Sequence, residues 1–179
     1  MKLKKSSAKV RDSDDIRSPW WNLAFRKGSL ERLLLSSLAD SDMKREQINQ
    51  LVGDSSRFVR HRLCSHALVE VHDEKYSLTE DGLRLHLALM FGLRPSSVLL
   101  LGHIYVHMGC GYYIKSYEAF TPINISRNRI MNAFRELRCR GFITGTSAGI
   151  LQIPPAMMKI LEPYGKTLIG IGNQVRSAQ

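Results

Sequence analysis

The sequence has few cysteines, and they are not spaced as pairs. Three stand far apart in a chain of 179 residues, at Cys64, Cys110 and Cys139. A zinc ribbon needs CxxC pairs, and a disulfide framework needs an even set of cysteines, so neither is indicated. We expect reduced thiols in a cytoplasmic protein. Because neighbouring cations lower a thiol pKa, a redox-sensing Cys64 or Cys139 near arginines is the alternative.

Long apolar runs are also missing. The most apolar stretch, residues 98–106, is short and is interrupted by Gly102 and His103. A membrane span needs roughly 20 consecutive apolar residues, so we expect no membrane segment. Polar residues rather than an apolar signal core follow the basic N-terminus, which argues against secretion.

Enzyme motifs are absent as well. The sequence contains neither a GK[ST] nor a GxGxxG pattern, and no Ser/His/Asp set stands out. The C-terminal half holds only three acids, Glu118, Glu136 and Glu162, so a general acid/base pair would be hard to build there. We predict that the protein is not an enzyme, with no catalytic residues and no cofactor.

One spacing is compatible with a metal site. His103, His107 and Cys110 lie at i, i+4 and i+7, which places them on one face of a helix. Only three ligands are visible, and Gly109 weakens the last turn of that helix. We therefore predict a core helix with polar interruptions and no metal site.

Positive charge is plentiful and unevenly distributed. The net charge is +10, made up of +5 in residues 1–28, −2 in residues 29–92 and +7 in residues 93–179. A basic excess attracts polyanions, of which nucleic acid is the commonest. The alternative is a basic surface with no nucleic-acid role.

Apolar periodicity predicts three helices, a hairpin and a further helix in the first half. Ser29 is the expected N-cap of the first helix, and Asp54 or Ser55 that of the third. The predicted helices cover 29–38, 43–51, 56–66 and 79–90, and the predicted strands cover 67–71 and 76–79.

The same order returns after Gly92 and Pro95. The helices expected there cover 96–106, 113–120 and 126–140, with Gly141 as the stop of the last, and the strands cover 142–144 and 150–153. Residues 157–161 could add one helical turn. We predict a mainly α fold with small β-hairpins (α+β), divided into a flexible basic arm (1–28), two units (29–92 and 93–162) and a C-terminal tail (163–179).

Three helices followed by a β-hairpin resemble the winged helix-turn-helix superfamily, over about residues 29–90 and 95–160. In one detail the first copy is similar to MarR- or ArsR-type regulators, because its second wing strand runs into Glu80-Asp81-Gly82-Leu83 and a helix. The resemblance implies a tandem winged helix-turn-helix protein with each third helix in the DNA major groove. It implies a bacterial-type transcriptional regulator that binds double-stranded DNA and acts with RNA polymerase or another regulator.

The third helix of the second copy has the side chains for this chemistry. Arginine reads guanine in a bidentate manner, and asparagine reads adenine. With Ile130, Phe134 and Leu137 facing the core, the opposite side carries base-reading candidates and the flanks carry phosphate candidates. The alternative is an ordinary solvated helix face. The candidates are Arg127, Asn128, Arg129, Asn132, Arg135, Arg138 and Arg140.

The first copy offers a smaller set on its third helix, namely Ser56, Arg57, Arg60 and His61. Its wing is acidic at residues 70–74, which would repel phosphate. This copy therefore either binds DNA through the helix alone or contacts a protein. Two other functions stay open for the whole chain: a plasmid or phage replication or partition protein that binds DNA, and a winged-helix adaptor that binds protein and no DNA.

Overall fold

The structure, a computed structural model, describes residues 29–109, 126–145 and 151–177. It is mainly helical with two small antiparallel sheets, so the predicted mainly α fold class with small β-hairpins is confirmed. The predicted arm at 1–28 and the predicted helix at 113–120 lie outside the described residues.

Residues 30–78 fold in the order helix, strand, helix, helix, strand, strand. The elements are α2 (Leu30–Asp40), β1 (Met43–Lys44), α3 (Arg45–Val52), the 3-10 turn η1 (Gly53–Ser55), α4 (Ser56–Ser65), β2 (Val69–His72) and β3 (Lys75–Leu78). The sheet has the order β1-β3-β2, with Met43 opposite Tyr76 and Val69 opposite Leu78. The sequence analysis missed β1 because a two-residue strand has no periodicity to detect.

One of the two predicted caps in this half is present. The Ser29 hydroxyl accepts a hydrogen bond from the Arg32 amide at 3.3 Å, so the cap of α2 is confirmed. The expected cap of α4 is wrong, because η1 runs directly into the helix and the Ser55 side chain makes no capping hydrogen bond.

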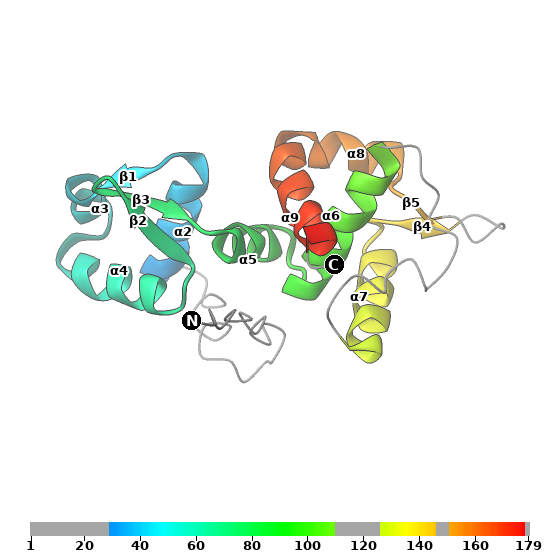
Figure 1. Cartoon of the computed structure of the whole chain (residues 1–179), viewed down its shortest axis with the longest axis horizontal. Helices are drawn as coiled ribbons and strands as arrows, with labels where there is room; N and C mark the ends of the chain where they lie inside the picture. The colour runs from blue at the N-terminus through cyan, green and yellow to red at the C-terminus, as the bar shows by residue number, and fades with distance from the viewer. Residues whose placement is uncertain (1–28, 110–125, 146–150, 178–179) are drawn as a thin grey trace, which may run out of the picture.

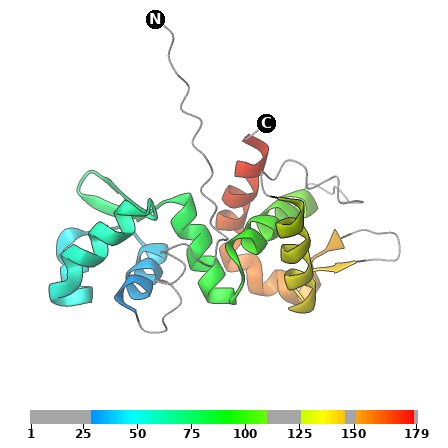
Figure 2. The ribbon, with the colours of Figure 1, turned by 90° about the horizontal axis from the view of Figure 1, so that it is seen from below.

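The next helix belongs to both cores of the molecule. α5 (Glu80–Phe91) places Leu85 in the apolar cluster of the first lobe and Leu87 in the cluster of the second. Its last residue, Phe91, meets the Phe142 ring edge to face, with the ring centroids 5.5 Å apart. Figures 1 and 2 show α5 running between the two lobes. The lobes are therefore joined by a packed helix.

The second lobe begins with a buried helix. Its elements are α6 (Pro95–Gly109), α7 (Arg127–Cys139), β4 (Thr144–Gly145), β5 (Leu151–Gln152), α8 (Pro155–Leu161), the 3-10 turn η3 (Glu162–Tyr164) and α9 (Gly165–Ser177). Leu100, Leu101 and Ile104 of α6 have no exposed surface. Within the described residues, no single helix is long and apolar enough to cross a membrane. Only α5 and α6 taken together pass that test, and they are bent by 100°.

The predicted tail at 163–179 contains a helix that is part of the core. Leu168 and Ile171 of α9 are buried against α6. The two helices approach closely where Gly102 faces Gly172, because neither glycine has a side chain to keep the backbones apart.

Helices α4 and α7 end in the same way. Ala67 and Gly141 both have left-handed backbones, with φ of 56° and 74°. In each case the amide of the following residue donates back to the last buried leucine of the helix, Leu63 (3.0 Å) or Leu137 (2.9 Å). This is the Schellman motif, which favours glycine at the left-handed position.

The Schellman motif shared by α4 and α7 predicts opposite changes in stability when Ala67 and Gly141 are exchanged for glycine and alanine, respectively. Ala67→Gly relieves the left-handed alanine, so we expect the free energy of unfolding to rise by about 1 kcal/mol. Gly141→Ala imposes the same strain, and no atom lies within 4 Å of the added methyl group, so we expect a loss of about 1 kcal/mol. Urea unfolding of both variants measures this. If the free energy of unfolding rose in both variants, or fell in both, the shared motif would be contradicted.

Candidate nucleic-acid interface

The core fixes which side of α7 faces solvent. Ile130, Ala133 and Leu137 are at most 5% exposed and pack in the cluster that contains α6. Because these positions repeat every three to four residues, the opposite side of the helix is open. The exposed predicted residues on α7 are Arg127, Asn128, Asn132, Arg135 and Arg138, while Arg129 is half-buried.

The only acid of α7 turns away from this open side. Glu136 accepts hydrogen bonds from the Ser97 hydroxyl at 2.5 Å and from the Arg94 amide at 3.1 Å. Arg94 directly precedes α6 and Ser97 lies in its first turn, so the carboxylate also interacts well with the helix dipole there. Among the residues of α7 itself, the open side therefore carries basic and amide side chains, and the single carboxylate of the helix is directed elsewhere.

Arg140 directly follows α7 and is also exposed, but it makes contacts within the molecule. Its Nη1 donates to the Phe91 backbone oxygen at 3.5 Å, and its Nε lies 4.0 Å from the Glu136 carboxylate. These contacts direct the side chain toward the end of α5. Arg140 therefore lies beside the C-terminal end of α5.

Helix α4 presents only part of its predicted set to solvent. Val59 and Leu63 are buried as expected, and Arg57 and His61 are exposed. Ser56 is 8% exposed. The sequence analysis placed Arg60 on an open face, but it is also only 8% exposed.

Arg60 is buried because Tyr76 of β3 packs against its side chain. Its Nε donates to the Ser56 backbone oxygen at 3.2 Å, and its Nη1 donates to the Tyr76 hydroxyl at 2.8 Å. The guanidinium lies 5.4 Å from the centre of the Tyr76 ring, which adds a cation–π contact. Such contacts hold the guanidinium in one place.

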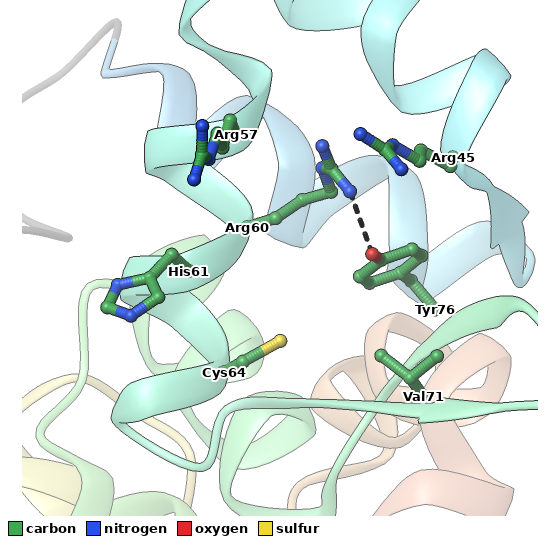
Figure 3. A pocket seen from close by; sticks show the side chains of 7 residues that line it. All are labelled: Arg45, Arg57, Arg60, His61, Cys64, Val71 and Tyr76. Carbon is green, nitrogen blue, oxygen red and sulfur yellow. Dashed lines mark hydrogen bonds between the residues drawn. The ribbon is translucent and has the colours of Figure 1, made fainter.

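Around Arg60 is a basic pocket of about 300 Å³, which we call the arginine pocket. In Figure 3, the guanidinium groups of Arg45, Arg57 and Arg60 gather along one side of it, and Cys64 and Val71 lie on the other. Its lining is Arg45, Arg57, Arg60, His61, Cys64, Val71 and Tyr76. Three of these were predicted DNA-binding residues, so the structure brings Arg57, Arg60 and His61 together.

The acidic wing does not line this pocket. Val71 and Tyr76 pair across the hairpin and both line it. Successive strand residues point to opposite faces, so Glu70 lies on the other face, where it pairs with His72 at 3.3 Å. The repulsion expected from Glu70 is therefore directed away from the arginines.

Four lining residues were not predicted as binding residues, namely Arg45, Cys64, Val71 and Tyr76. Of these, Arg45 and Tyr76 carry the polar groups. They come together because β1, which ends just before Arg45, pairs with β3, which contains Tyr76. Only the pairing of β1 could have revealed this, and β1 is too short to be read from the sequence.

The environment of Cys64 argues against the redox alternative for this residue. Burial raises the pKa of the Cys64 thiol, and nearby Arg60 offsets this only in part. The thiolate fraction at neutral pH is therefore small. We expect iodoacetamide to modify Cys64 several times more slowly than the exposed Cys139, measured peptide by peptide with mass spectrometry. Equal rates would contradict the burial of this thiol.

Parts of the predicted second wing and of the metal spacing lie outside the described residues, at 146–150 and at Cys110. His103 is 1% exposed, with its ring 4.4 Å from that of His107. Across the described ranges, no three or more His, Cys, Asp or Glu side chains gather as a metal site would need.

Comparison with protein-family models, with curated proteins and with solved structures gives no significant match.

Proposed function

We propose that the protein is a sequence-specific transcriptional regulator that binds double-stranded DNA through two winged helix-turn-helix units. The first unit has the order helix, strand, helix, helix, strand, strand and a β1-β3-β2 sheet. This is the arrangement in which α4 would be the recognition helix and the β2–β3 hairpin the wing.

The second unit is supported by its likeness to the first. α7 ends on the same motif as α4 and is followed by a hairpin, β4–β5. Aligning Ala67 with Gly141 pairs the buried Val59 with Ala133, and the exposed His61 with Arg135. α7 is thus the counterpart of α4, and α8 and α9 are additions to this unit.

The observation that carries the proposal is the open side of α7. Asn132 and Arg135 are exposed there, on a helix whose opposite side is buried in the core. The Glu136 carboxylate accepts a hydrogen bond from a serine of α6 and is not available on this side. Asparagine and arginine are the side chains that read adenine and guanine in the major groove. Arg127 and Arg138 flank them as phosphate contacts, which position the helix.

Selection from a random duplex pool tests sequence specificity. The full chain is incubated with the pool, bound duplexes are recovered over several rounds, and the products are sequenced. We expect one motif to be enriched, with guanine and adenine at its contacted positions. A pool that is retained without any enriched motif would contradict sequence-specific recognition.

A further inference from the structure

Among the residues that the structure describes, the buried cation Arg60 has no carboxylate partner. Its described hydrogen bonds go to the Ser56 backbone oxygen and the Tyr76 hydroxyl, both neutral. Within the described residues, no acidic side chain lies within 4.0 Å of it. A buried charge is costly unless it is paired, so the site lacks the negative charge that would balance it.

We propose that the arginine pocket is a binding site for one phosphate group. Arg60 is the fixed donor at its base, and Arg45 and Arg57 close over the anion from the N-terminal ends of α3 and α4. Arginine suits this role because its planar fork offers two parallel hydrogen bonds to phosphate oxygens.

The remainder of the lining is consistent with a group that carries more than the phosphate. The volume of about 300 Å³ exceeds that of a lone phosphate. Val71, Cys64 and the Tyr76 ring form the less polar side. Such a pocket accepts an esterified phosphate, either of a DNA backbone or of a small phosphomonoester. The inference rests on the proposed function only for the choice between these two sources.

Cys64 reports on the site within the intact chain. We would measure iodoacetamide modification of each cysteine in full-length protein against rising inorganic phosphate, with chloride keeping the ionic strength constant. Bound phosphate covers the thiol and disfavours its thiolate, so we expect Cys64 to be protected severalfold and Cys139 to be unaffected. Absence of protection at Cys64, or equal protection of both cysteines, would overturn the proposal.

Variants show which arginines hold the anion. Arg57→Ala removes an exposed side chain, so the fold should persist, and the phosphate concentration for half-protection should rise about tenfold. Arg94→Ala, directly before α6, removes another exposed arginine that lies outside the pocket and outside the proposed DNA contacts, and it should leave that concentration unchanged. Equal effects of the two substitutions would mean nonspecific attraction and would overturn the proposal. Arg60→Met, which keeps the apolar stem, should abolish protection.

A duplex competitor identifies the source of the phosphate. If added duplex DNA protects Cys64 by itself and displaces phosphate, the group bound is a backbone phosphate. If the duplex binds by fluorescence anisotropy but leaves the phosphate dependence unchanged, the pocket serves a small phosphomonoester. If the duplex does not bind and phosphate still protects Cys64, the proposed function fails while this site stands.

Discussion

The Asn132→Ala/Arg135→Ala variant should lose at least about 30-fold in affinity for the selected DNA site. In the proposed function each of these exposed residues makes a bidentate contact with a base, and such a contact contributes roughly 1–3 kcal/mol of discrimination. Neither residue is buried, so the free energy of unfolding should change little. Fluorescence anisotropy with a labelled duplex, at one fixed salt concentration, measures the loss.

A matched control separates this effect from a mere reduction in charge. Asn49→Ala/Lys159→Ala also removes one amide and one cation from exposed positions, but these lie on α3 and α8. We expect that variant to stay within about threefold of wild type, because distant exposed charges are largely screened. Equal losses in the two double variants would contradict base reading by α7.

The close crossing of α6 and α9 should be intolerant of even one methyl group. A Cβ at residue 172 would collide with the Gly102 backbone oxygen and lie 2.7 Å from Val106 Cγ2. Because backbone cannot move aside cheaply, we expect Gly172→Ala to lower the free energy of unfolding by about 2–3 kcal/mol. Thermal and urea unfolding measure the change.

Gly170 is the control on the same helix. Nothing lies within 4 Å of a Cβ at this position, so alanine there brings only its better helix propensity. We expect Gly170→Ala to raise the free energy of unfolding by about 0.5–1 kcal/mol. If Gly172→Ala were also stabilising, α9 would not pack on α6 as described.

The helices could be predicted because their buried residues follow a period of 3.6. On α7, Ile130 and Leu137 are buried as predicted, while the predicted Phe134 is only half-buried and Ala133 is fully buried beside it. The Ser29 cap was also predictable, because it depends on local chemistry alone. What the sequence could not show was the role of the glycines in α9, since a close crossing depends on the partner helix.

The α7 surface was predictable, whereas the arginine pocket was not. On α7 the exposed face follows directly from the apolar face of the same helix. The pocket depends on contacts among four elements, α3, α4, β2 and β3, and above all on Tyr76, which helps to remove Arg60 from solvent. Long-range contacts of this kind leave no periodic signal in the chain.

The salt dependence of duplex binding tests the central claim most directly. Affinity of the full chain for duplex DNA should fall steeply and linearly on a log–log plot, because each neutralised phosphate releases counterions. The Arg127→Ala/Arg135→Ala variant should bind more weakly and give a slope shallower by about one for each phosphate that it no longer neutralises. No binding at low salt, or an unchanged slope and affinity in the variant, would contradict α7 as the DNA-contacting helix.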